Sequence, residues 1–193
     1  MVSKPKRRPT IYSALGELAV KWNQVELTAR SIIKFYYRLG DYGEILIAHM
    51  GNVTLADALN TLSAEFAEPE ERPHLAHFIA YADAVRSYRN YYVHGVVQAD
   101  GGFGNVQQIQ AKGRLTITTE RISVAQVRQV IGMCECAATY GGMILALGAS
   151  RGTPEHAWVL ESASLYKPPL PATLRKPRRY LLEPAPPPRS SPE

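Results

Sequence analysis

The residues with the clearest chemical potential lie in one short run, Ser87 to Gly95, which reads SYRNYYVHG. Arg89 supplies a guanidinium that can hold a phosphate through two parallel hydrogen bonds and offset charge that develops during a reaction. His94 supplies an imidazole, the side chain suited to proton transfer near neutral pH. Asn90 could fix the geometry between them. These three residues could therefore break a phosphodiester without a metal ion, by moving a proton from a ribose 2′-hydroxyl or to a leaving 5′-oxygen.

The spacing predicts how a helix would present these side chains. The pattern indicates a helix from about Arg72 to His94, with Gly95 as its C-cap. Arg89 falls on the apolar stripe of that helix. The other members of this stripe are Phe78, Ala82, Val85 and Val93. Because a buried unpaired charge is costly, Arg89 needs an acidic or phosphate partner, and Glu26, on the first predicted helix, is the candidate within the chain.

A polar stripe should lie beside the apolar one. Asn90 and His94 are four residues apart and share a face, and Asp83 and Arg86 extend that face backwards along the helix. Arg86 is therefore a candidate contact for RNA. Nearby aromatic rings could stack on the bases of single-stranded RNA. These are Tyr88, Tyr91 and Tyr92.

Each of these residues also has an ordinary structural interpretation. Arg89 could belong to a structural ion pair, and Asn90 could hydrogen-bond the end of the helix. His94 could interact with the helix dipole. Taken singly, the tyrosines are more often core or interface residues than stacking platforms.

The elements that must position the run are mostly helical. Apolar residues recur at steps of three and four from Tyr12 to Leu39, which predicts a long amphipathic helix. A second helix is expected from about Leu55 to Phe66, capped by Asn52 or Thr54. A short apolar piece, residues 45–50, lies between the two.

After the central helix, the pattern changes to short strands joined by turns, at about residues 96–119. Ser123 then opens a last long helix, from Val124 to about Ala149. The sequence therefore predicts an all-α fold, an antiparallel helical bundle with a small β-hairpin or meander inserted between its last two long helices.

The net charge of +5 comes from the two ends of the chain. Residues 1–11 form a basic N-terminal arm, and residues 151–193 are basic and rich in proline, which predicts a disordered tail. The expected helical domain, residues 12–150, is slightly acidic. Attraction to nucleic acid is therefore expected mainly from the arms and from local patches.

The order of these features resembles the HEPN superfamily (higher eukaryote and prokaryote nucleotide-binding). The resemblance covers residues 12–149 and rests on the WNQVE segment of the first helix, the Arg-Asn-x-x-x-His run at the end of a later helix, the strand insertion and the final helix. The superfamily signature is an arginine, commonly followed by a polar residue, with a histidine four to six residues further on. Arg89, Asn90 and His94 match it.

The resemblance implies a metal-independent endoribonuclease that cleaves single-stranded RNA by 2′-hydroxyl attack and leaves a 2′,3′-cyclic phosphate. It also implies a homodimer whose two motifs face one composite cleft, and a toxin or antiviral role with a possible neutralising antitoxin or other protein partner. The alternative is a non-catalytic HEPN module that binds nucleic acid or a partner protein in a regulatory or immunity system. Toxins modified by a partner nucleotidyltransferase often carry a tyrosine two residues after the histidine, and this chain has Val96 there.

No cofactor or metal is expected. Glu71, His74 and His77 lie at three-residue steps, but nothing completes a ligand set, so solvated helix residues are the favoured interpretation. The chain shows no run of apolar residues long enough to span a bilayer and no apolar stretch behind its basic start. A cytoplasmic protein without a membrane segment is therefore expected.

Overall fold

The computed structural model describes residues 9–40, 42–111, 115–172 and 180–181. The protein is mostly helical and carries a small antiparallel sheet, as the sequence predicts. In chain order the elements are α1 (Ile11–Tyr36), α2 (Gly43–Ala48), α3 (Asn52–Glu65), α4 (Arg72–Gly95), β1 (Val96–Asp100), β2 (Phe103–Ala111), β3 (Leu115–Ser123), α5 (Val124–Ala149), α6 (His156–Leu165) and β4 (Tyr180–Leu181).

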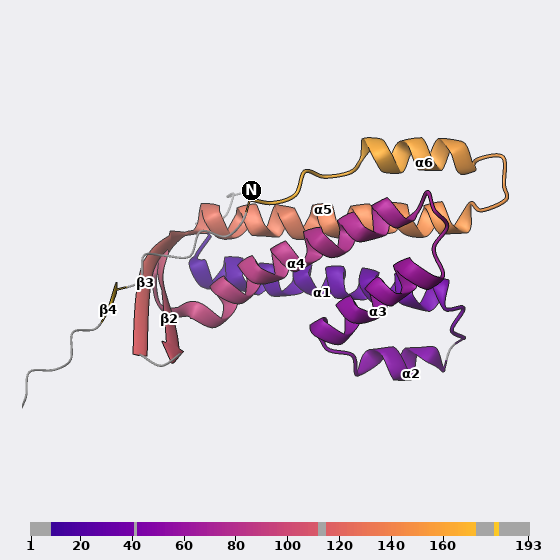
Figure 1. The fold of residues 1–193 in the computed structure, drawn as a ribbon. Coiled ribbons are helices and arrows are strands. Elements are labelled where there is room, and N and C mark those ends of the chain that lie inside the picture. The colour runs from indigo at the N-terminus through magenta and orange to yellow at the C-terminus, as the bar shows by residue number, and fades with distance from the viewer. Residues whose placement is uncertain (1–8, 41, 112–114, 173–179, 182–193) are drawn as a thin grey trace, which may run out of the picture.

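Three long helices, α1, α4 and α5, make the body of the molecule (Figure 1). Helices α1 and α5 both begin at the sheet and run parallel, while α4 runs the opposite way and ends at the sheet. Lys21 on α1 pairs with Glu135 on α5 at 2.8 Å. Further along both helices, a Cβ on Gly141 would lie 2.4 Å from Thr28 Cγ2 and 2.9 Å from Phe78 Cε2. A glycine therefore lets all three helices approach closely at one point.

Side chains fix where the two helices at the sheet end begin. Thr10 caps α1 and Ser123 caps α5, each in a reciprocal capping box in which the third helical residue bonds back to the cap. The start of α5 at Ser123 was predicted from the sequence and is confirmed. Helix α3 begins earlier than expected, with Gly51 at the N-cap position, so the predicted caps Asn52 and Thr54 lie inside the helix.

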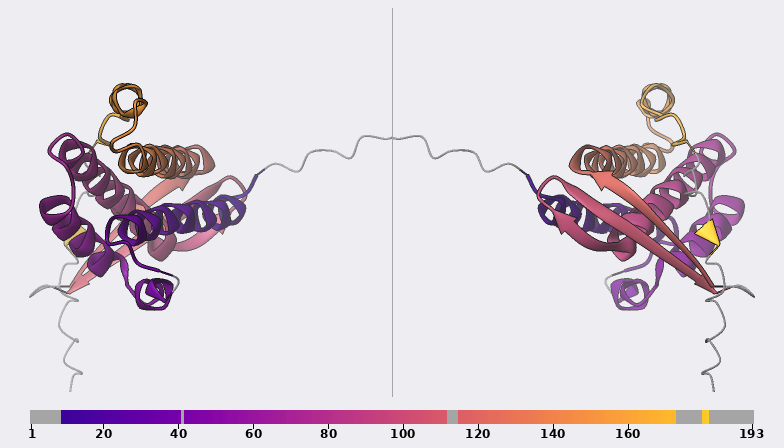
Figure 2. Two further views of the ribbon diagram at one scale, coloured as in Figure 1. Left: turned by 90° about the vertical axis from the view of Figure 1, so that its right-hand side faces the viewer. Right: turned by 90° about the vertical axis from the view of Figure 1, so that its left-hand side faces the viewer.

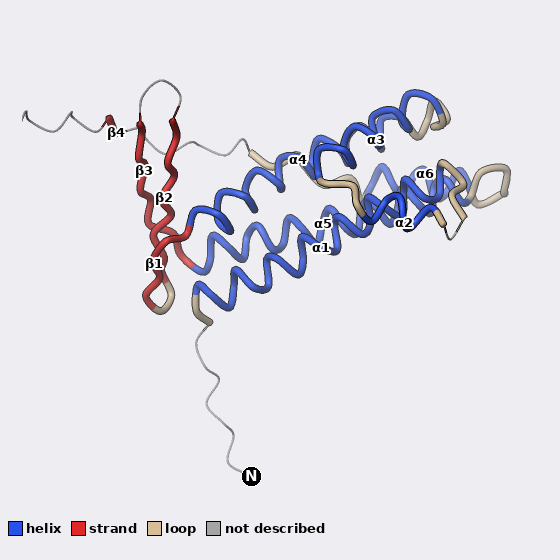
Figure 3. Tube along the Cα trace, turned by 90° about the horizontal axis from the view of Figure 1, so that it is seen from below, coloured by secondary structure: helices blue, strands red, loops and turns tan. Residues whose placement is uncertain are grey.

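The sheet has the strand order β1-β2-β3-β4, with every neighbouring pair antiparallel, and lies at one end of the helices (Figure 3). The turn between β1 and β2 holds both α1 and α5, because Ile11 N–H donates to Gly101 O and Val124 N–H donates to Gly102 O, each at 3.0 Å. Because β1 directly follows α4, these two hydrogen bonds place the starts of α1 and α5 at the same end of the molecule as the catalytic candidates at the end of α4.

Gly95 ends α4 as predicted, but for a different reason. It does not have the positive φ of a left-handed helix cap, and β1 follows at once. A Cβ at Gly95 would lie 2.4 Å from Val106 Cγ1 on β2. Glycine is therefore suited to this position because the end of α4 packs directly onto the sheet.

The chain beyond Ala149 differs from the predicted disordered tail. Helix α6 packs on α5 through Val159, Ala163 and Leu147, and Figure 2 shows it lying outside the three long helices. The following segment, residues 166–172, is called the C-terminal strap here. The Nε2–H of His77 donates to Pro168 O at 2.7 Å, and Tyr88 Oη donates to Ala172 O at 2.6 Å.

The other residues expected to be disordered or basic arms, 1–8, 173–179 and 182–193, lie outside the described residues. Sequence periodicity missed α6 because its apolar residues form no continuous stripe. Two of its larger apolar residues, Trp158 and Leu165, are exposed.

By length and composition alone, α5 would be apolar enough to cross a membrane. This differs from the expectation that no apolar stretch is long enough to span a bilayer. Many of the apolar side chains of α5 pack against neighbouring helices, and a core helix passes the same test of length and composition, so one such helix is weak evidence for a membrane span.

Candidate functional site

The last two turns of α4 bring the three catalytic candidates together. One guanidinium nitrogen of Arg89, Nη1, lies 2.9 Å from Asn90 Oδ1 and 3.2 Å from His94 Nε2. Asn90 and His94 are exposed, and Arg89 is half-buried. The long arginine side chain therefore reaches across the helix surface to the histidine.

The contact between Arg89 and His94 defines which ring nitrogen of the histidine can accept a hydrogen bond. A guanidinium has only donors, so in a hydrogen bond between these two atoms His94 Nε2 is the acceptor. The lone pair of Nε2 therefore points at Arg89. It can act as a general base only when another acceptor takes the place of His94 on the guanidinium.

Arg89 retains donor capacity beyond these two contacts. Its Nε is buried and has no acceptor among the residues that the structure describes. The guanidinium also lies close enough to Cys134 on α5 to influence the pKa of that thiol. Burial dominates there and raises the Cys134 pKa to about 12, while Glu135 also raises it and Arg89 opposes both. Because a guanidinium carries five N–H donors, Arg89 can also take an additional acceptor such as a phosphate oxygen through its other nitrogens.

The predicted ion pair between Glu26 and Arg89 is wrong. Glu26 Oε1 instead accepts a hydrogen bond from Trp22 Nε1 at 2.6 Å, and its Oε2 lies 3.9 Å from Arg30 on the same helix. Within the described part of the chain, Arg89 pairs with no acidic residue. The Glu26 carboxylate contacts residues one turn away on its own helix, Trp22 and Arg30. Sequence spacing alone does not show whether a side chain will bind such a neighbour or a residue on another helix.

The polar stripe predicted on α4 is present. Arg86 Nη2 pairs with Asp83 Oδ1 at 2.5 Å, three residues back along the helix. Both residues line a hollow together with Glu26, between α1, α3 and α4. The polar stripe that carries Asn90 and His94 therefore continues to the edge of a surface depression.

The tyrosines expected to stack on bases occupy other positions. Tyr91 and Tyr92 are buried in the core, and Tyr91 Oη donates a hydrogen bond to Glu120 on β3. Burial raises the pKa of Tyr92 to about 12, with Glu120 adding to the effect. Tyr88 is half-buried and donates to Ala172 O of the C-terminal strap at 2.6 Å. Tyr91 and Tyr92 are therefore core residues and do not offer open ring faces to RNA.

The possible metal ligands do not gather. Among the described residues, no group of three or more histidine, cysteine or carboxylate side chains could hold an ion. Glu71 and His74 are also not solvated, contrary to the sequence interpretation: their exposed fractions are 0% and 6%. His74 Nδ1 lies 2.8 Å from Tyr140 Oη, and Glu71 belongs to a separate polar network.

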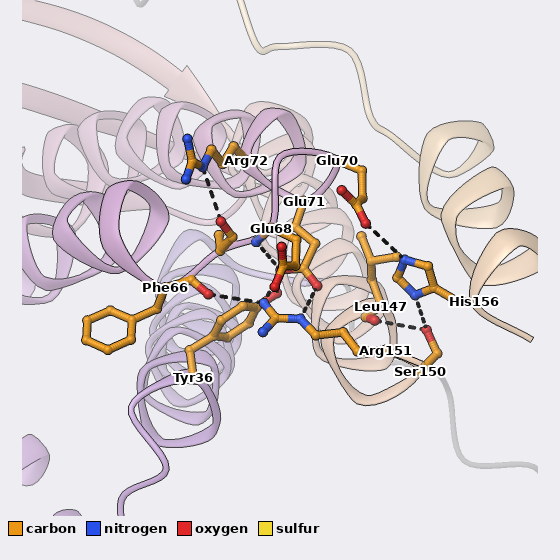
Figure 4. A network of polar contacts seen from close by, with 11 residues as sticks. Tyr36, Phe66, Glu68, Glu70, Glu71, Arg72, Leu147, Ser150, Arg151 and His156 are labelled. Carbon is orange, nitrogen blue, oxygen red and sulfur yellow. Dashed lines mark hydrogen bonds and ion pairs between the residues drawn. The ribbon is translucent and has the colours of Figure 1, made fainter. Parts of the chain in front are cut away.

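That network, shown in Figure 4, was not predicted. Arg151 Nε donates to Glu71 Oε1 at 2.6 Å, and Arg151 Nη2 also bonds Glu71. Tyr36 Oη donates to Glu71 Oε2 at 3.1 Å, and the Glu68 N–H adds another donor at 3.2 Å. The network therefore ties α1 and the start of α4 to the turn that follows α5.

A second chain of contacts in Figure 4 resembles a catalytic triad in composition only. Ser150 Oγ lies 3.0 Å from His156 Nδ1, and His156 Nε2 lies 3.5 Å from Glu70 Oε1. The Ser150 hydroxyl, however, donates to Leu147 O at 2.9 Å. The hydroxyl hydrogen of Ser150 is therefore used in a hydrogen bond to the backbone of α5 and does not point at His156. The cluster connects the start of α6 to the end of α5 and does not activate a nucleophile.

Comparison with known protein families, curated proteins and solved structures finds no match to this chain.

Proposed function

We propose that the protein is a HEPN-type, metal-independent endoribonuclease that cleaves single-stranded RNA. The observation that carries the proposal is the cluster of Arg89, Asn90 and His94, in which a single guanidinium nitrogen contacts both other side chains. The mostly helical fold, with its strand insertion between α4 and α5, is compatible with the HEPN resemblance.

The reaction begins when the scissile phosphate binds Arg89. The phosphate oxygens compete with His94 for the guanidinium donors, because a charged acceptor forms the stronger hydrogen bond. His94 Nε2 is then free to accept the proton of the ribose 2′-hydroxyl. Asn90 holds Arg89 through its Oδ1 and limits the orientations of the guanidinium.

The 2′-oxygen then attacks phosphorus, and the bond between phosphorus and the 5′-oxygen breaks. The products are a 2′,3′-cyclic phosphate and a free 5′-hydroxyl. Arg89 offsets the negative charge that builds on the phosphate oxygens in the transition state. In a cleft formed by two copies of the chain, a second, protonated His94 would supply the proton that the leaving 5′-oxygen needs.

Two copies and a controlling partner are part of the proposal. Several large apolar side chains on α1 are exposed and could contribute to an interface between copies. These are Tyr12, Val20, Leu27 and Phe35. A cytoplasmic toxin or defence protein of this kind would also need a neutralising antitoxin or another protein that restrains it.

The first test is an RNA cleavage assay in EDTA, with wild type beside Arg89→Ala and His94→Ala. We expect wild type to cut single-stranded RNA and to leave 2′,3′-cyclic phosphate ends. Both variants should lose at least about 99% of the rate, as removal of a transition-state donor typically costs 10²–10³-fold. His49→Ala, an exposed histidine after α2, is the matched control and should cleave normally. Persistent activity in both site variants would exclude this site.

The second candidate is a non-catalytic HEPN module that binds nucleic acid or a partner protein. One observation favours it: Arg89, Asn90 and His94 satisfy one another on a single helix, as residues of a structural helix end would. In that case RNA or a partner binds without being cleaved, and His94→Ala leaves the affinity unchanged.

A further inference from the structure

A hollow of about 40 Å³ opens on the surface between α1, α3 and α4. Its floor is apolar and includes Leu55, Leu59 and Phe78, which are all buried core residues. Ala56 on α3 contributes to its wall. A depression of this size is too small to enclose a ring, but its apolar floor can contact the edge of a planar ring that lies against the surface.

The rim of the hollow carries two carboxylates with acceptor capacity left. Glu26 uses Oε1 to accept from Trp22, and its Oε2 is 3.9 Å from the nearest arginine, beyond hydrogen-bond range. Asp83 uses Oδ1 to accept from Arg86, and no described residue donates to its Oδ2. In each carboxylate, one oxygen therefore accepts a hydrogen bond from the protein, and the other oxygen can accept one from a ligand.

The hollow is aligned with the candidate catalytic residues. Asp83, Arg86, Asn90 and His94 follow one another at steps of three and four along α4, which places them on one flank of the helix. Arg86 and Asn90 are about 6 Å apart along the helix axis, from the rise of 1.5 Å per residue. A strand of RNA with its phosphate on Arg89 would therefore bring an adjacent base to the hollow.

We propose that the hollow is a base-binding subsite that selects cytosine over uracil next to the cleaved phosphate. This inference rests on the proposed ribonuclease function. The two bases have the same ring size, so the apolar floor accepts both. They differ at ring position 4: the exocyclic amine of cytosine donates to a carboxylate placed there, whereas the carbonyl oxygen of uracil would oppose it. The proposal therefore requires a rim carboxylate to face position 4, since uracil can offer a carboxylate only its ring N3–H.

The test separates binding from cleavage. The full chain carrying His94→Ala is titrated with the eight-nucleotide RNAs C8 and U8, and the cut sites of wild type are mapped on an RNA that contains both bases. We expect C8 to bind about tenfold more tightly than U8, in the range of a single good carboxylate–amine contact, and cuts to occur beside cytosine.

Two changes in the subsite should remove this preference. Asp83→Asn replaces an acceptor with an amide that also donates, so the ratio of the two affinities should fall towards one. Ala56→Leu fills the hollow and should have the same effect. Ala64→Leu, the same change at an exposed position of α3, is the control and should keep the preference. Thermal melting of each variant checks that it is folded.

The outcomes distinguish the two proposals. Equal binding of C8 and U8, or a preference that survives both Asp83→Asn and Ala56→Leu, overturns the subsite even where cleavage occurs. A cytosine preference that depends on Asp83 and Ala56, without cleavage of any RNA, supports the subsite and overturns the ribonuclease.

Discussion

At the scale of single residues, Arg89 connects the core to the candidate site. Its stem belongs to the core side of α4, beside Cys134, while its Nη1 holds Asn90 and His94 at the surface. The sequence predicted that Arg89 would emerge from an apolar stripe, because helix periodicity determines which residues share a face. It mispredicted the acidic partner, because Glu26 is held by Trp22 on its own helix.

Arg89→Lys tests whether the planar guanidinium is needed rather than a positive charge alone. A lysine is a single-point donor on a flexible stem and cannot reproduce the two-pronged contact with a phosphate. We expect the cleavage rate of single-stranded RNA to fall about 100-fold or more, while the melting temperature changes little. Single-turnover kinetics at saturating enzyme measures the chemical step. A rate within threefold of wild type would contradict this role.

At the scale of elements, the sequence predicted what local patterns can determine. The long helices, the insertion after α4 and the Ser123 cap follow from periodicity, strand-like alternation and a polar residue before an apolar run. Helix α6 and the contacts of the C-terminal strap were not predicted, because they depend on surfaces that α4 and α5 present only after folding. The burial of Tyr91 and Tyr92 likewise follows from the sheet that folds against the end of α4.

The closest contact among the long helices gives a test of the packing. Gly141→Ala would place a Cβ 2.4 Å from Thr28 Cγ2 and 2.9 Å from Phe78 Cε2, so either these side chains or the helices that carry them must shift. Overpacking of this kind typically costs 1–3 kcal/mol, and urea unfolding should show a loss of about that size.

Gly142→Ala is the matched control on the next residue. Nothing lies within 4 Å of its added Cβ, and the position is exposed. Because alanine is the better helix former, we expect a gain of about 0.5–1 kcal/mol. A similar change in stability for both variants would mean that α1, α4 and α5 do not meet at Gly141.

At the scale of the whole molecule, the network around Glu71 joins parts of the chain that are far apart in sequence. Glu71 is fully buried, and its partners Tyr36 and Arg151 come from the end of α1 and from the turn after α5. The sequence favours a solvated Glu71, because a single glutamate beside other glutamates gives no sign of a partner 80 residues away. The network lies at the far end of the helices from the sheet, opposite the candidate site (Figures 1 and 4).

The pH dependence of folding should report on this network. Burial alone would raise the pKa of Glu71, but hydrogen bonds from Arg151, the Glu68 N–H and Tyr36 together lower it below the ordinary value of 4.5. A carboxyl whose pKa is lower in the folded state contributes stability above its unfolded pKa and loses that contribution as the pH falls through the folded pKa. Glu71→Gln should therefore cost about 1–3 kcal/mol at pH 7, since it removes the charged acceptor of Arg151, whose side chain is one-third exposed to solvent.

The difference between wild type and Glu71→Gln should stay constant from pH 7 to about 5. It should narrow as the pH falls below the ordinary carboxyl pKa of 4.5 and through the lower folded pKa, because acid then removes the same charge from wild type. Urea unfolding at a series of pH values measures this difference directly. Glu70→Gln is the control: Glu70 is partly exposed and its contact with His156 is 3.5 Å long, so a change below about 1 kcal/mol is expected. A difference for Glu71→Gln that stays constant with pH would show that the Glu71 carboxylate does not hold the ends of α1, α4 and α5 together.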